Sequence, residues 1–104
     1  MRYYEVAPTI IVRDGQQTFT YAHSEPLVVG AIVEIEIGKR QGVGVVIKEV
    51  DEPPYPTKPI THAVYDTPLP LELVQTSIWI AEYYATPLAT VLQTLLPRRS
   101  EERR

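Results

Sequence analysis

The chain has 104 residues, of which 44% are hydrophobic and 22% are charged, and its formal net charge is −3. This composition is typical of one globular domain, and a chain of this length buries roughly two thirds of its unfolded surface. The lack of cysteine excludes disulfides, a thiol nucleophile and a thiolate zinc site. No apolar run reaches the ~18 residues of a membrane-spanning helix, and no apolar leader is visible, so neither is expected.

The charges are unevenly distributed along the chain. Residues 98–104 hold four arginines and two glutamates, which leaves six basic and eleven acidic side chains in residues 1–97. A protein that wraps duplex DNA neutralises many phosphates and is usually basic over its whole domain. The charge distribution therefore favours a small local nucleic-acid site, such as one for a strand end, or a protein-binding surface without nucleic acid.

The N-terminal part of the sequence is rich in β-branched residues, which favour strands. Tyr3–Val12 is apolar and is interrupted by Pro8, so it predicts one strand or two short ones. Thr18–Tyr21 alternates hydroxyl-bearing and aromatic residues. This alternation predicts a short strand with Phe19 and Tyr21 on one face.

The clearest pattern is that of a β-hairpin. Ala31–Ile37 alternates apolar and acidic residues, so one face of this strand is expected to be buried. A turn is expected over residues 38–42, and Val43–Val50 predicts the return strand. The odd-numbered apolar residues of the return strand are expected on the same face as those of the first: Val43, Val45 and Ile47. Val46 and Val50 are apolar on the other face, so this strand is expected to be covered on both sides.

The rest of the chain predicts a loop, a strand and two helices. Residues 51–59 contain four prolines and are expected to form an extended loop before a strand at Ile60–Tyr65. From Leu71 onward, apolar residues three and four apart predict a helix. Thr86 as N-cap and Pro87 as first residue predict a second helix. The first helix is expected to bury Leu71, Val74, Ile78, Ala81 and Ala85, widened by Leu73, Ile80 and Tyr84.

These elements predict a mainly β fold, a small barrel with two short C-terminal helices packed on it. Trp79 is expected to be structural, together with the leucines of the second helix: Leu88, Leu92 and Leu95. One ring of the Tyr83–Tyr84 pair is expected to be buried. We expect one domain over residues 1–97, with residues 98–104 forming a charged tail or the start of a linker.

No pattern typical of an enzyme's active site is found in the sequence. His23 and His62 have no accompanying cysteine, so ordinary strand or loop histidines are the simpler interpretation. Gly42–Gly44 lacks the third glycine and the following helix of a dinucleotide-binding loop, and no Walker lysine motif occurs. Glu34 and Glu36 are expected on a solvated strand face.

Two features suit nucleic acid, and each has an ordinary structural alternative. Phe19 and Tyr21, on one face of a small barrel, either stack on bases or belong to the core. The Gly38–Arg40 turn either places cations and backbone amides beside a phosphate or is a common charged hairpin turn.

The order of these elements resembles the N-terminal DNA-binding domain of the replication-restart helicase PriA. The most specific segment is Trp79–Leu88, W-I-A-E-Y-Y-A-T-P-L, which is similar to the family's W-x-A-D-Y-Y-x-x-P-L. Three further segments agree in order. Thr18–Tyr21 resembles the family's x-F-D-Y, Gly30–Val46 resembles its glycine-bounded hairpin, and Lys58–Ile60 resembles part of its L-K-P-I.

The resemblance implies a permuted oligonucleotide-binding fold that recognises the 3' end of the nascent leading strand at a stalled fork. The residues that it assigns to the end-binding pocket are Phe19, Thr20, Tyr21, Gly38 and Lys58, and we add the turn cation Lys39. Where the family typically has an aspartate, this chain has Thr20. A threonine hydroxyl makes a weaker, neutral hydrogen bond to a 3'-hydroxyl than a carboxylate does, so selection for a free 3'-hydroxyl is expected to be altered.

The resemblance also implies what lies outside this chain. The family's ATPase motifs and zinc module are C-terminal to the domain, so we expect no enzyme, no ATP and no zinc here, and either a fragment or a product without the helicase. The expected partners are 3'-terminated and forked DNA, primosome proteins and single-stranded DNA-binding protein, at forks in the bacterial cytoplasm and away from membranes. The alternative is a domain that docks replication partners and contacts DNA weakly.

Overall fold

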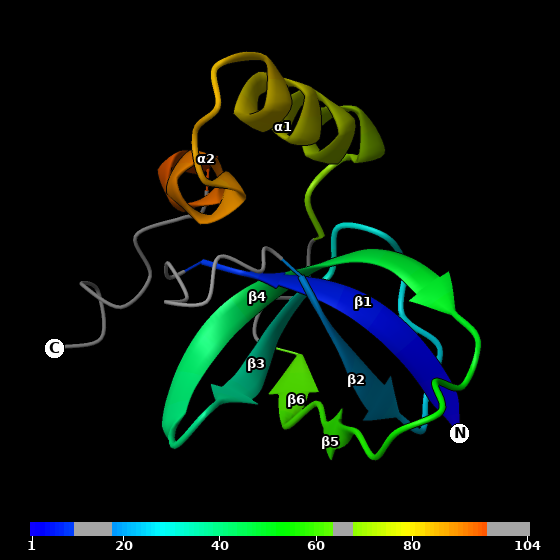
Figure 1. Cartoon of the computed structure of the whole chain (residues 1–104). Helices are drawn as coiled ribbons and strands as arrows, with labels where there is room; N and C mark the ends of the chain where they lie inside the picture. Colours follow the sequence, from blue (N-terminus) through cyan, green and yellow to red (C-terminus); the bar gives the residue numbers. More distant parts are fainter. Residues whose placement is uncertain (10–17, 64–67, 96–104) are drawn as a thin grey trace, which may run out of the picture.

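The computed structural model describes residues 1–9, 18–63 and 68–95, and shows a curled sheet with two helices on it (Figure 1). The elements are β1 (Arg2–Pro8), β2 (Phe19–His23), β3 (Ile32–Ile37), β4 (Arg40–Val50), β5 (Lys58–Pro59), β6 (His62–Ala63), α1 (Leu71–Tyr83) and α2 (Leu88–Leu95). This confirms the predicted fold class. The predicted ends of the first strand at Val12 and of the last at Tyr65, and the tail 98–104, lie outside the described residues.

One short segment joins the two edges of the sheet. The strand order is β5-β2-β1-β4-β3-β6, so the consecutive strands β5 and β6 occupy opposite edges. Between them, the N–H of Ile60 donates to the carbonyl of Ala22 at 2.8 Å and the N–H of Thr61 donates to the carbonyl of Glu34 at 2.9 Å. Figure 1 shows β5 and β6 between β2 and β3. The segment therefore closes the sheet toward a small barrel, which leaves few unpaired strand edges.

The barrel interior is filled by side chains from most strands. The buried residues of this cluster are Tyr4, Val6, Tyr21, Val33, Ile35, Val46 and Ile60. Gly44 makes room for them, because a Cβ on that residue would lie 2.5 Å from Cγ1 of Val6 and 3.2 Å from the carbonyl oxygen of Ala7. Any larger residue at Gly44 would therefore push β1 and β4 apart.

The predicted face of the return strand is wrong. The turn consists of only Gly38 and Lys39, so the register pairs odd-numbered residues with even-numbered ones, such as Val33 with Gly44. The five-residue turn that we expected would have paired odd with odd. The apolar residues Val43, Val45 and Ile47 consequently pack on the outer face, toward the helices.

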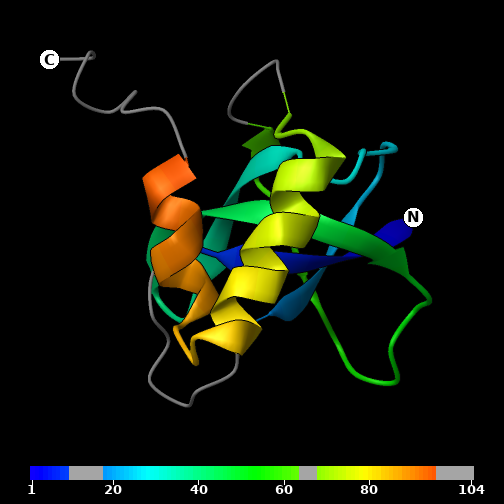
Figure 2. The same cartoon turned by 90° about the horizontal axis from the view of Figure 1, so that it is seen from above.

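The two helices cover the outer face of the sheet. Figure 2 shows α1 and α2 side by side over β1 and β4. The buried cluster between the layers contains Ala7, Ile32, Val45, Leu69, Val74, Ala81, Leu88 and Leu92. Leu92 has no exposed surface, and the side-chain amide of Gln93 donates to the carbonyl of Thr9 just beyond β1. These contacts fix α2 on the sheet.

The buried stripe of α1 is narrower than predicted. Its buried residues are Val74, Ser77 and Ala81, and the Ser77 hydroxyl is satisfied by donating to the carbonyl of Leu73 at 2.7 Å. The predicted members that are exposed instead are Leu71, Leu73, Tyr84 and Ala85. A small barrel and one short neighbouring helix cover only one side of α1, so apolar spacing alone overestimated its burial.

The aromatic residues of α1 and of its C-cap are also more exposed than predicted. Trp79 is 57% exposed, and Tyr83 and Tyr84 are 67% and 65% exposed. The prediction that Trp79 packs in the core is therefore wrong, as is the prediction that one of the two tyrosine rings is buried. Their side of α1 faces away from the sheet.

The junction between the helices differs by one residue from the prediction. The N–H of Thr86 donates to the carbonyl of Ala81 at 3.0 Å and Ala85 has a φ of 54°, which is a Schellman-type end for α1. The Thr86 hydroxyl donates to the carbonyl of Tyr84 at 3.4 Å. Thr86 thus completes α1, and the carbonyl of Pro87 accepts the first bond of α2.

Candidate nucleic-acid interface

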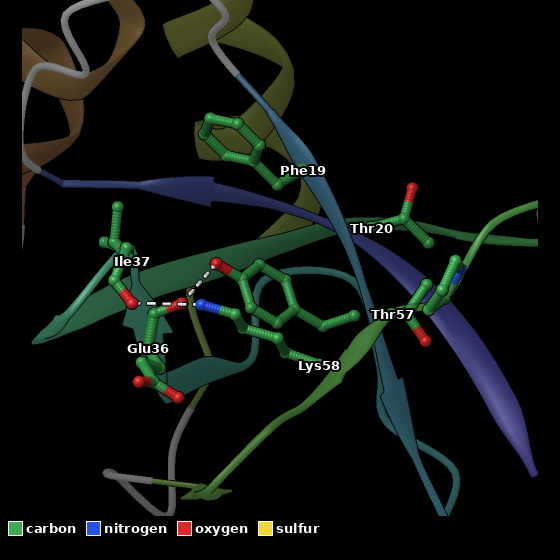
Figure 3. A pocket seen from close by; sticks show the side chains of 9 residues that line it. Phe19, Thr20, Glu36, Ile37, Thr57 and Lys58 are labelled. Carbon is green, nitrogen blue, oxygen red and sulfur yellow. Dashed lines mark hydrogen bonds between the residues drawn. The ribbon is translucent and has the colours of Figure 1, made fainter.

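A cavity of about 380 Å³ lies between β2, the tip of the β3–β4 hairpin and the segment that leads into β5 (Figure 3). Its lining residues are Phe19, Thr20, Tyr21, Glu36, Ile37, Gly38, Pro56, Thr57 and Lys58. The volume is near the lower end of the range for ligand sites, roughly 300–1,000 Å³. Such a cavity suits a single nucleotide better than a run of nucleotides.

The β2 wall of the cavity contains one core aromatic residue and one more accessible one. Tyr21 is only 4% exposed, and its hydroxyl donates to the backbone carbonyl of Glu36 at 2.9 Å. Burial raises the pKa of Tyr21 above 10.0, and the negative charge of Glu36 raises it further, so the phenol stays a donor at neutral pH. Phe19 is half-buried. Of the two predicted aromatics, Phe19 is therefore the one with ring surface for a base.

Thr20 is positioned differently from its two neighbours. Figure 3 shows Thr20 and Phe19 projecting to opposite sides of β2, as expected for consecutive strand residues. Thr20 pairs with Glu5 of β1 across the sheet. Its half-buried side chain therefore contributes to the cavity from the outer side of the strand, beside Thr57 in this view.

The hairpin tip is shaped by Gly38. Ile37 pairs with Arg40, which leaves a two-residue turn whose first residue, Gly38, has a φ of 62°. This is the position that favours glycine in type II′ turns. The carbonyl of Gly38 accepts a hydrogen bond of 3.0 Å from Nζ of Lys58. The conformation of the turn therefore determines where the ammonium group of Lys58 lies beside the cavity.

The basic side chains of the described residues fall into two groups. Two are paired, Arg2 with Glu49 at 3.2 Å and Lys48 with Glu5 at 3.7 Å. The other basic residues in residues 1–9, 18–63 and 68–95 lie at the hairpin tip and on β5: Lys39, Arg40 and Lys58. Although the chain is acidic overall, this end of the barrel carries a local group of cations.

The structure brings most of the sequence-predicted site residues around one cavity. Those that line it are Phe19, Thr20, Tyr21, Gly38 and Lys58, whereas Lys39 is exposed in the turn and does not line it. The roles of all six in binding DNA stay predictions. Sequence reasoning missed four lining residues: Glu36, Ile37, Pro56 and Thr57. Their only signal was proximity in sequence to Gly38 and Lys58.

The chemistry of the cavity is that of binding by charge, hydrogen bonding and stacking. Its charged side chains are Glu36 and Lys58, and both are exposed. Across the described part of the chain, no three His, Asp or Glu side chains gather closely enough to hold a metal ion. None of the helices in this described part of the chain is long and apolar enough to span a bilayer.

Comparison with known proteins gives one consistent family. Residues 9–97 match the family of the 3'DNA-binding domain (3'BD) of PriA. The replication restart protein PriA of Helicobacter pylori strain J99 is 30% identical over 97 residues, which is 93% of this chain and 15% of that protein. PriA of Helicobacter pylori strain 26695 gives the same values.

The extent of the match shows how much of these proteins the chain corresponds to. The chain spans about 15% of the length of the curated relatives. The matched DNA-binding domain accounts for residues 9–97 of the 104 residues. The match confirms the resemblance carried by Trp79–Leu88 and the hairpin. The chain belongs to the family of PriA 3'-DNA-binding domains.

Proposed function

We propose that this chain captures the 3' end of a DNA strand at a stalled replication fork, as one domain of a PriA-like restart protein. The observation that carries the proposal is that Phe19, Thr20, Tyr21, Gly38 and Lys58 gather around the same cavity. The family to which the chain belongs is one of 3'-DNA-binding domains. A cavity for one nucleotide favours a strand end, because an internal nucleotide must continue in both directions.

The terminal base is proposed to stack on Phe19. This ring is half-buried and lines the cavity, while the neighbouring Tyr21 is anchored in the core by its bond to Glu36. Stacking on an aromatic ring is worth roughly 1–3 kcal/mol per base and depends little on which base it is. The proposed pocket therefore selects an end and not a sequence.

The terminal phosphodiester is proposed to lie near Lys58. The ammonium is exposed and is held at the cavity mouth by the carbonyl of Gly38, with Lys39 and Arg40 on the same hairpin tip. The carboxylate of Glu36 is exposed on the adjacent strand and repels phosphate. Together these charges favour entry of the backbone from the side of Lys58.

The wider setting is also part of the proposal. We propose that the end bound in cells is that of the nascent leading strand at a fork in the bacterial cytoplasm. Primosome proteins and single-stranded DNA-binding protein are the proposed partners there. ATP and zinc are proposed to act in other parts of a PriA-like protein and not on these residues.

Docking of a protein is the second candidate function for this domain. It is favoured by three exposed aromatic side chains, Trp79 and Tyr83 of α1 and Tyr84 directly after it. These residues belong to a different element from the cavity, so this function is compatible with DNA capture.

A salt titration of binding to a short single strand tests DNA capture. Each neutralised phosphate contributes about −0.7 to the slope of log affinity against log salt, so capture through two or three phosphates predicts a slope of about −1.4 to −2.1. A slope several times steeper would indicate a long backbone-tracking groove. Lack of binding at low salt would leave only the docking function.

A further inference from the structure

Tyr55 is an exposed aromatic residue in the segment that leads into β5. It is 56% exposed, and it belongs to neither of the two buried clusters. Within the part of the chain that the structure describes, its side chain makes no hydrogen bond and no ring contact. The packing of the domain therefore gives no reason for a large ring at this position.

Three prolines stiffen the backbone around this ring. Pro53, Pro54 and Pro56 flank Tyr55, and the chain bends at Pro54 and Tyr55. Each proline fixes its own φ near about −65°, and the residue before a proline is largely confined to extended conformations. The backbone of Tyr55 is therefore restricted before any ligand binds, which lowers the entropy that is lost when the ring engages one.

Tyr55 lies next to the wall of the proposed 3'-end pocket. Pro56 and Thr57, which directly follow it, line the cavity (Figure 3). The next residue, Lys58, pairs with Tyr21 of β2, which holds the segment against the cavity. Adjacent Cα atoms are about 3.8 Å apart, close to the roughly 3.4 Å between stacked nucleotides of one strand. Tyr55 is therefore about one nucleotide away from the cavity wall.

We propose that Tyr55 stacks on the penultimate base of the captured strand, so that the site holds two nucleotides, one in the cavity and one on the ring. This inference rests on the proposed 3'-end capture, in which Phe19 holds the terminal base. When the terminal base enters the cavity, its neighbour loses a stacking partner. An aromatic ring beside the cavity replaces that partner, and it does so for any base.

Charges on the same segment orient the strand. Lys58 is three residues after Tyr55, whereas Glu52 and Asp51 precede it by three and four residues. All three charged side chains are exposed. The phosphodiester between the last two nucleotides is attracted to Lys58 and repelled by the two carboxylates. The backbone therefore passes on the side of β5, and a longer path along the acidic start of the segment is disfavoured.

Single abasic sites test the proposal, because each removes one base and keeps every phosphate. The competitors for a labelled strand carry an abasic site at the terminal position, at the penultimate position or well inside the strand. The parent is expected to lose at least about five-fold in affinity with the terminal or the penultimate abasic site. The internal abasic site is expected to have no effect.

Tyr55→Ala assigns the penultimate contact to the ring. This variant is expected to bind the intact strand at least about five-fold more weakly than the parent, and to lose nothing further with the penultimate abasic site, because ring and base form one contact. The terminal abasic site should still weaken its binding fully. Tyr55→Phe is expected to bind like the parent, since stacking needs the ring and not the hydroxyl. Tyr83→Ala, which removes a similarly exposed tyrosine from α1, is the matched control and should change nothing.

The outcomes separate this inference from 3'-end capture itself. A loss with the terminal abasic site, together with no effect of Tyr55→Ala, would overturn the second stacking position and leave end capture intact. An equal loss with the penultimate abasic site in the parent and in Tyr55→Ala would assign that base to another group and would also overturn it. If neither the terminal nor the penultimate abasic site weakens binding, end capture fails, and this inference fails with it.

Discussion

Nζ of Lys58 donates a 3.0 Å hydrogen bond to the carbonyl of Gly38, and this bond connects β5 to the tip of the β3–β4 hairpin. Tyr21 makes a similar connection one strand further in, from β2 to the carbonyl of Glu36. The two bonds bracket one wall of the cavity. The bond of Tyr21 belongs to the core, because that side chain is buried. The bond of Lys58 holds an exposed ammonium group where a ligand can reach it.

Lys58→Ala is expected to weaken DNA binding without changing the melting temperature, because a hydrogen bond at an exposed site adds little to stability. Loss of one phosphate contact should make the salt slope less negative by about 0.7. The measurement is anisotropy of a labelled single strand across a salt series. Lys48→Ala is the matched control, since it removes an exposed lysine that pairs with Glu5 outside the cavity. Equal effects of the two variants would argue against a specific role for Lys58.

Leu92→Ala is expected to destabilise the domain by about 2–5 kcal/mol, because this side chain is fully buried between α2 and the sheet. Trp79→Ala removes a larger side chain but is expected to cost less than about 1 kcal/mol, because the ring is 57% exposed. Urea unfolding of the two variants compares them directly. A larger loss for Trp79→Ala would mean that its ring supports the fold after all.

Ala85→Gly is expected to stabilise the domain by roughly 0.5–1 kcal/mol. Ala85 has a φ of 54° at the end of α1, a conformation that costs an L-residue about 1–2 kcal/mol and glycine almost nothing. The greater freedom of glycine in the unfolded chain offsets part of this gain. Ala85→Val is the opposing variant and should lower the melting temperature. If both substitutions destabilise equally, the end of α1 is not strained.

The strands were predictable because their residues alternate. Ala31–Ile37 shows one apolar and one acidic face, and β3 follows that pattern with Val33 and Ile35 buried. The turn length was not predictable, because Gly38 and Gly42 both suit a turn and the register depends on which one is used. Choosing the longer turn reversed the predicted face of β4.

The site was predictable as a set of residues but not as a cavity. Phe19 and Lys58 come from segments that the family resemblance singled out, yet nothing local in the sequence shows that β2 and β5 are neighbours. Glu36 also lines the cavity because segments that are far apart in the sequence lie together in the fold. The exposure of Trp79 was also missed, because helical spacing shows which residues share a face but not whether another element covers that face.

Thr20→Asp is expected to increase discrimination between 3'-hydroxyl and 3'-phosphate ends. A carboxylate accepts a strong hydrogen bond from a hydroxyl and repels a phosphate, whereas threonine does neither. In this chain the new carboxylate would lie across from Glu5, so some stability is expected to be lost. Anisotropy with two oligonucleotides that differ only at the 3' terminus measures the effect.

Thr20→Asn is the control for this substitution, because it has the size of aspartate without the charge. Only Thr20→Asp should reject the phosphate. If the parent already rejects the phosphate strongly and Thr20→Asp changes nothing, the side chain at position 20 does not reach the strand end.

The most direct test of 3'-end capture compares linear and circular forms of one single-stranded sequence as competitors for a labelled strand. The two forms share every base and almost every phosphate, but only the linear form has an end. Stacking of one terminal base is worth roughly 1–3 kcal/mol. Capture of an end in the cavity therefore predicts that the linear form competes at least about five-fold better, and that Phe19→Ala removes most of the difference. Equal competition by the circle would contradict end recognition by this domain.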